Sequence, residues 1–318
     1  MADARLGVYG GAALAAYGFG SSHPFGVDRH DTFWHACERL GLAPRARRLA
    51  PVRADRALLA LFHDPAYLDF VAERCRIGGG FLDAGDTPAQ PGLDAAAAVV
   101  VGTTVDACRR ALDGELDRAF VPIAGLHHGA RAAAAGFCVY DDCGVAIEWL
   151  RTQGLKRVAY VDIDAHHADG VFYAFESDPD LLFADVHEDG RFLYPGTGAA
   201  SETGSGAARG TKLNLPLLPG SDDAAFHGAW REVERYLAAL RPEFILFQCG
   251  ADSVAGDPMA HLRFTPAVHA HAAARLCAIG AAAGSRGLVA LGGGGYDHAN
   301  LAAAWTGVVG ALLEAPRA

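Results

Sequence analysis

Short apolar segments alternate with longer segments of helical periodicity along most of the chain. Six apolar segments have the length and composition of buried strands: residues 6–9, 120–123, 158–163, 181–186, 244–249 and 288–291. Six segments have helical periodicity: residues 63–77, 93–112, 143–151, 222–240, 266–283 and 298–313. This alternation predicts an α/β fold, in which helices cover both faces of a central, mostly parallel sheet. No linker or repeat divides the chain, so we expect one domain over residues 1–318.

Composition adds limits on the kind of protein. Of the 318 residues, 51% are hydrophobic and 20% are charged, which is ordinary for a globular protein with a large core. The net charge of −10 argues against nucleic-acid binding and mildly favours cationic substrates. Charges, glycines or prolines interrupt every long apolar run, so no membrane-spanning helix is expected. Residues 6–20 could instead form the core of a signal peptide, but they are rich in glycine, and we expect a strand there.

The seven cysteines are scattered, and none forms a Cys-x-x-Cys pair. This spacing argues against a disulfide framework or a structural zinc knuckle, and it favours a reducing compartment. We therefore expect a cytoplasmic protein in which most cysteines are small, buried hydrophobic residues.

The segment after residue 160 has the densest chemistry, because Asp162, Asp164, His166, His167 and Asp169 follow one another within eight positions. Side chains two apart on an extended chain point to the same face, and a carboxylate with an imidazole suits a divalent transition metal such as zinc. The alternative is a strand end whose acids only cap the next helix. Acids and imidazoles at this density are rarely buried without a partner or a metal.

Other predicted strands also end in polar residues. His127 and His128 follow residues 120–123, His187 and Glu188 follow 181–186, Asp252 follows 244–249, and Tyr296 follows Gly292–Gly295 after 288–291. Each could serve only a local turn or cap. In a parallel sheet, however, these ends share one edge, where such folds bind their ligands. Asp164, His166 and Asp252 would then form a three-ligand metal site with an open position, as in catalytic zinc sites.

Taken in chain order, the motifs resemble those of the zinc-dependent histone deacetylase and acetoin-utilisation family, in its class I form. They are Ser22-His-Pro, Arg29, Asp86, His127-His128, Gly136-Phe-Cys138, Asp162-x-Asp-x-His-His-x-Asp-Gly170, Tyr194-Pro-Gly-Thr-Gly198, Gly250-Ala-Asp252 and Gly292-Gly-Gly-Gly-Tyr296. The resemblance implies an arginase/deacetylase fold and a zinc-dependent amidohydrolase that removes acetyl or related acyl groups from lysine side chains. The chain has no long basic tail, so a bacterial enzyme without a chromatin role is expected.

The resemblance also implies roles for individual residues. One Zn²⁺ would be bound by Asp164, His166 and Asp252. The catalytic set would be His127 paired with Asp162, His128 paired with Asp169, and Tyr296. His128 would act as general base and then general acid, and Tyr296 would stabilise the oxyanion.

Substrate-binding and cation-binding positions follow from the same resemblance. Substrate would meet Asp86 at the rim and Gly136, Phe137, Tyr194 and Met259 along a narrow channel. A structural K⁺ would be bound by Asp162, Asp164, His166, Asp185 and Val186. Two departures affect these expectations: Tyr194 and Asp185 stand where relatives commonly carry phenylalanine and serine.

Three alternatives stay open at this point. The substrate could be an acetylpolyamine or another small acylated amine, because specificity depends on rim loops. A dimanganese ureohydrolase would need further acids, and the segment at Asp252 supplies only one. A non-catalytic acyl-lysine binder would not need the complete set of ligands, His–Asp pairs and tyrosine.

Overall fold

The fold is built around one eight-stranded sheet. The computed structural model describes residues 3–20 and 23–316, so Ser22 of the predicted amino-terminal motif lies outside the described residues. The strands are β1 (Asp3–Tyr9), β2 (Ala46–Leu49), β3 (Arg118–Val121), β4 (Val158–Asp162), β5 (Leu181–Glu188), β6 (Lys212–Leu217), β7 (Phe244–Gln248) and β8 (Leu288–Leu291). Every pair of neighbours is parallel, in the order β2-β1-β3-β8-β7-β4-β5-β6. The α/β prediction with a central parallel sheet is thus confirmed.

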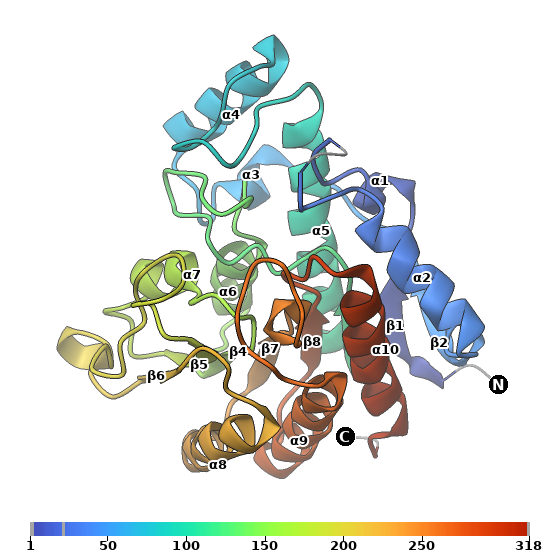
Figure 1. Ribbon diagram of the computed structural model, residues 1–318, viewed down its shortest axis with the longest axis vertical. Helices are drawn as coiled ribbons and strands as arrows, with labels where there is room; N and C mark the ends of the chain where they lie inside the picture. The colour runs from blue at the N-terminus through green and yellow to red at the C-terminus, as the bar shows by residue number, and fades with distance from the viewer. Residues whose placement is uncertain (1–2, 21–22, 317–318) are drawn as a thin grey trace.

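Helices cover both faces of the sheet, as Figure 1 shows. They are α1 (Ala12–Ala15), α2 (Arg29–Arg39), α3 (Arg56–Leu59), α4 (Pro65–Ile77), α5 (Leu93–Leu112), α6 (Asp142–Thr152), α7 (Asp169–Ala174), α8 (Asp223–Leu240), α9 (Pro266–Ala283) and α10 (His298–Glu314). Helices α8, α9, α10 and α2 pack side by side over one face, and α5 and α6 pack together on the other. None of the described helices is long and apolar enough to cross a lipid bilayer.

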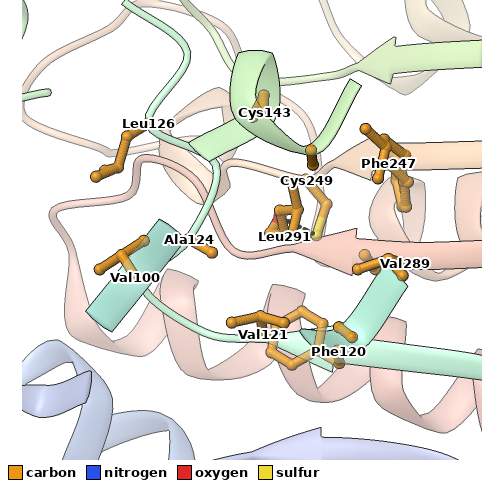
Figure 2. Packing of buried hydrophobic residues seen from close by; sticks show 14 of the residues in the cluster. Val100, Phe120, Val121, Ala124, Leu126, Cys143, Phe247, Cys249, Val289 and Leu291 are labelled. Atoms are coloured by element: carbon orange, nitrogen blue, oxygen red, sulfur yellow. Dashed lines mark hydrogen bonds between the residues drawn. The ribbon is translucent and has the colours of Figure 1, made fainter. Parts of the chain in front are cut away.

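Burial on both faces explains the composition of the inner strands. Every residue of β3, β4, β5, β7 and β8 is buried, which is why these segments are runs of apolar residues. Figure 2 shows Phe120, Phe247 and Val289 from three neighbouring strands within the core. All seven cysteines are buried and free, which confirms the prediction that they act as small hydrophobic residues.

Several elements differ from the sequence-based prediction. The segment at residues 6–9 belongs to β1, an inner strand, and the buried side chains of Leu14 and Tyr17 follow it, so the signal-peptide alternative is wrong. Two strands were not predicted, the edge strands β2 and β6, because neither has a continuous apolar run. The helices that were not predicted are the four short or early ones, α1, α2, α3 and α7.

Candidate active site

The strand order places the functional segments next to one another. The five strands β3, β8, β7, β4 and β5 are consecutive neighbours in the sheet, and their carboxyl ends therefore share one edge. The polar residues predicted at strand ends lie in the last positions of these five strands or in the loops directly after them. This edge is where open α/β sheets bind their ligands.

Asp164, His166 and Asp252 form a buried cluster at this edge. His166 Nδ1 lies 3.1 Å from Asp164 Oδ1 and 3.1 Å from Asp252 Oδ2. One ligand atom from each residue lies within 4.8 Å of the others, and among residues 3–20 and 23–316 this is the group whose side chains could hold a metal ion. Ligands bound tetrahedrally at about 2.0–2.1 Å lie roughly 3.3 Å apart, and the two distances from His166 to the carboxylates, both 3.1 Å, are close to this spacing.

The electrostatics of the cluster also favour a cation. Burial opposes protonation of His166, but the two carboxylates outweigh it and raise the pKa of His166 to about 10. Burial, followed by the charge of Asp164, raises the pKa of Asp252 to about 7. The carboxylates of Asp164 and Asp252 thus stabilise the proton on His166. A divalent ion would neutralise the same two carboxylates in place of that proton, so the donor set fits Zn²⁺.

Glycines on two loops allow the backbone to reach the carboxylates. A Cβ atom at Gly250 would lie 2.0 Å from Asp164 Oδ2, and one at Gly294 would lie 2.1 Å from Asp252 Oδ2. The N–H of Gly294 donates to Asp164 Oδ2 at 2.9 Å, and the N–H of Ala165 donates to Asp252 Oδ1 at 2.8 Å. The carboxylates are therefore oriented by main-chain donors that a larger residue would displace.

Two histidine–aspartate pairs flank the cluster. His127 Nδ1 lies 2.9 Å from Asp162 Oδ2, and His128 Nδ1 lies 2.6 Å from Asp169 Oδ1. In each pair the carboxylate holds Nδ1 and leaves Nε2 available for other partners. Burial, followed by the neighbouring His127, lowers the pKa of His128 although Asp169 opposes the shift. His128 is therefore neutral near pH 7, the state that a general base needs.

Tyr296 closes the site from the loop after β8. Its N–H donates to Asp257 Oδ2 at 2.7 Å, while the guanidinium of Arg29 lies 5.7 Å from its ring and donates to Gly293 O and Gly295 O. Burial, followed by the carboxylates of Asp252 and Asp164, raises the pKa of the Tyr296 phenol well above its ordinary value. The phenol thus stays protonated and can donate a hydrogen bond.

A small cavity of about 10 Å³ lies among these groups. Its walls include Phe25, His127, His128, Gly136, Cys138, Asp164, His166 and Tyr296. The Phe137 ring lies 5.9 Å from that of Tyr296, and the half-exposed Tyr194 ring lies 5.1 Å from that of His128. The rings of Phe137 and Tyr194 therefore lie next to Tyr296 and His128, two residues that line the cavity.

The remaining predicted substrate positions lie at different distances from this cavity. Gly136 lines it, and a Cβ there would lie 2.4 Å from His128 Cδ2. Asp86 is exposed, and its carboxylate accepts from Thr87 Oγ1 at 3.2 Å. Met259 does not line the cavity, but its N–H donates at 2.9 Å to Asp257, the residue that also holds Tyr296.

The predicted K⁺ site stays a prediction. Asp162 and Asp185 are paired across β4 and β5, with Val186 following, so the named residues are neighbours. The carboxylate of Asp185 already has partners, since Oδ1 lies 2.8 Å from His187 Nδ1 and Oδ2 accepts from Ala168 N at 3.0 Å. Burial, followed by the charge of Asp185, raises the pKa of Asp162 well above its usual value. A nearby cation would stabilise the ionised carboxylate and oppose this shift.

Two residues of the site were missed from the sequence. Gln248 Nε2 donates to Asp164 Oδ2 at 2.9 Å, and its Oε1 accepts from Gly250 N at 2.7 Å. Tyr160 donates to Asp162 Oδ2 at 2.5 Å. Gln248 could have been recognised as the polar residue near the end of an otherwise apolar buried strand. Tyr160 gives no such signal, because tyrosine is common in strands.

Comparisons with known proteins agree with this geometry. The model of the histone deacetylase domain matches residues 23–312. The acetoin utilization protein AcuC of Bacillus subtilis is 35% identical over 298 residues, which cover 88% of this chain and 75% of that protein. Histone deacetylase 8 of Danio rerio is 34% identical over 284 residues, covering 87% and 74% respectively. The crystal structure of the HDA15 HD domain superposes with a TM-score of 0.90 at 26% identity, covering 99% of this chain and 91% of that one.

The fold and the site are thus those of a deacetylase-type hydrolase. The chain belongs to the histone deacetylase family, as the resemblance of its motifs predicted, and it has the arginase/deacetylase fold.

Proposed function

We propose that this protein is a zinc-dependent deacetylase that hydrolyses acetyl-lysine, or a related acyl-lysine, in proteins or peptides. The observation that carries the proposal is that His128, Tyr296 and two members of the ligand cluster, Asp164 and His166, line one cavity, with Asp252 and Asp169 bonded directly behind them. Asp164, His166 and Asp252 would hold the ion. When bound, Zn²⁺ supplies Lewis-acid activation of a water molecule and of the amide carbonyl.

The residues of the chain then move protons and stabilise charge. Neutral His128 accepts a proton from the attacking water and delivers it to the leaving nitrogen as the C–N bond breaks, so that amide and water become carboxylic acid and amine. Asp169 holds Nδ1 of His128 at 2.6 Å and favours its protonated form during the transfer. Tyr296 donates to the carbonyl oxygen as negative charge develops there. Phe137 and Tyr194 flank the unbranched lysine chain.

Acetate release from an acetyl-lysine peptide by the zinc-loaded protein tests the proposal. Tyr296→Phe should lower kcat/KM, because about 2–4 kcal/mol of transition-state stabilisation is lost. The circular dichroism spectrum should stay unchanged. Tight binding of the peptide by the zinc-loaded protein without any release of acetate would identify a non-catalytic acyl-lysine binder. That result would overturn the proposal. An unchanged rate in Tyr296→Phe would remove Tyr296 from the mechanism.

A small acylated amine is a second candidate substrate, because two acids, Asp83 and Asp86, lie in the loop beside Phe137. Thr87 joins this loop to the wall, since its Oγ1 bonds both Asp86 and Phe137 N. Carboxylates there could bind the ammonium groups of a polyamine as well as the amides of a peptide. The ratio of kcat/KM for an acetylated peptide and for acetylputrescine decides between the two substrates.

A further inference from the structure

Phe137 stands between Gly136 and Cys138, which line the cavity, and its ring lies 5.9 Å from that of Tyr296, another lining residue. Its backbone conformation is unfavourable. Its φ is 68°, and that of the preceding Gly136 is 53°, so two consecutive residues lie in the left-handed region. Glycine adopts this region freely, but phenylalanine does so only where surrounding contacts hold it there. The contacts that hold the backbone of Phe137 therefore determine the position of its ring beside the cavity.

Two buried hydroxyl groups bind the backbone of Phe137 from opposite sides. Tyr17 donates from its hydroxyl to Phe137 O at 2.6 Å and accepts from Val139 N at 3.1 Å. Thr87 Oγ1 accepts from Phe137 N at 3.2 Å. Both side chains are fully buried, at 0% exposure, so water does not compete for these bonds. Tyr17 and Thr87 thus satisfy both polar backbone groups of Phe137.

The same threonine joins the wall to the rim. Thr87 Oγ1 also donates to Asp86 Oδ1 at 3.2 Å, so one hydroxyl accepts from the wall and donates to the predicted rim carboxylate. A threonine hydroxyl has one proton and two lone pairs, and this pair of bonds uses the proton and one lone pair. The position of Asp86 is therefore coupled to that of Phe137.

We propose that Tyr17 and Thr87 are positioning residues that hold Phe137 and thereby set the width of the channel for the acyl-lysine chain. This inference rests on the proposed function. Neither residue lines the cavity, and neither bonds to a metal ligand or to a histidine–aspartate pair. Their effect passes through the Phe137 ring, whose centroid lies 5.9 Å from that of Tyr296 and 4.6 Å from that of His23.

Loss of either hydroxyl should weaken substrate binding more than it slows the reaction. Without its partners, Phe137 can relax toward an ordinary conformation, and its ring would leave the wall against which the lysine methylene groups pack. The zinc ligands and His128 are placed by other contacts and would stay where they are. If the free energy of one ordinary hydrogen bond is lost from substrate binding, the affinity falls about fivefold.

The test compares Tyr17→Phe and Thr87→Val with two matched controls. Tyr67→Phe removes a buried tyrosine hydroxyl that donates to Val139 O at 2.7 Å in the same segment. Thr103→Val removes a buried threonine hydroxyl that accepts from Val52 N at 3.0 Å, away from the site. All four variants lose one buried hydroxyl, so urea denaturation should give similar losses of stability. We expect KM for an acetyl-lysine peptide to rise about fivefold in Tyr17→Phe and Thr87→Val, with kcat within twofold of wild type, and KM to stay unchanged in both controls.

A straight-chain hydroxamate gives a second measurement that needs no turnover. Its Kd should rise by a similar factor in Tyr17→Phe and Thr87→Val, while the zinc content of all variants stays at the wild-type value. Unchanged KM and Kd in the two variants would overturn the inference, and so would an equal rise in Tyr67→Phe, since the segment would then be loosened as a whole. If the wild type releases no acetate, the proposed function fails, and the hydroxamate Kd still tests the role of the two hydroxyls.

Discussion

Replacement of Gly294 by alanine tests the metal-ligand geometry directly. A Cβ atom at Gly294 would lie 2.1 Å from Asp252 Oδ2 and 2.8 Å from Asp164 Oδ2, whereas ordinary contacts begin at 3.4 Å. The nearer carboxylate oxygen must therefore move by about 1 Å. The backbone of Gly294 is not left-handed, so alanine fits its main-chain conformation and the conflict is confined to the two ligands.

This displacement is large compared with what a zinc site tolerates. Zinc–ligand distances vary by about 0.2 Å, and changes in groups that only orient the ligands cost about 10–100-fold in affinity. We expect Gly294→Ala to weaken zinc binding by at least about 100-fold, which corresponds to roughly 2.7 kcal/mol. Competition with a chelator of known affinity measures the loss, and melting with and without zinc shows whether the metal-free protein is folded.

Gly228→Ala is the matched control. Gly228 lies within α8, and a Cβ there meets no atom within 4 Å. Alanine should stabilise the helix by roughly 0.5–1 kcal/mol and leave zinc affinity unchanged. A folded Gly294→Ala protein with wild-type zinc affinity would refute the placement of Asp164 and Asp252 around one ion.

Four further results are expected. Burial, followed by Asp83, raises the pKa of Asp86 to about 6, so KM should rise as the pH falls through 6, and Asp86→Asn should remove this dependence. His128 has a lowered pKa, so kcat should persist as the pH falls through 6.5, the ordinary value for histidine, and decline only below it. Gln248→Met should weaken zinc binding about 10–100-fold in chelator competition, because Asp164 loses a side-chain donor. Tyr160→Phe should lower the free energy of unfolding by about 1–3 kcal/mol in urea, since Asp162 loses its phenol partner.

The inner part of the sheet was predictable from sequence because burial on both faces demands apolar runs. β4 and β7 are such runs, and each is followed directly by the residues of the site. The edge strand β2 has the sequence Ala-Arg-Arg-Leu, in which the two arginines are exposed, so it carries no comparable pattern. β6 has the sequence Lys-Leu-Asn-Leu-Pro-Leu beside a glycine-rich loop, so it also lacks a continuous apolar run. Edge strands escape prediction because one side of each faces solvent.

Only the ionisable residues of the candidate site could be predicted from the sequence. Asp164, His166 and Asp252 could be named because carboxylates and imidazoles at strand ends have few other roles. The groups that orient these residues could not be predicted, because they are not ionisable. Gln248 donates from its side-chain amide and Gly294 donates from its backbone N–H. Tyr17 lies 120 positions from Phe137, and nothing in its neighbourhood in the sequence points to that contact.

The order of the strands also bears on how the molecule is made. β7 and β8, the last two strands synthesised, lie between β3 and β4. A nascent chain that has left the ribosome only as far as residue 240 therefore holds two groups of three strands, β2-β1-β3 and β4-β5-β6, that do not pair with each other in the sheet. The two halves of the sheet unite only when residues 244–291 arrive, and Tyr296 follows directly behind. A shortened chain ending before β8 would therefore lack the strand that joins β3 to β7, and it would also lack Tyr296.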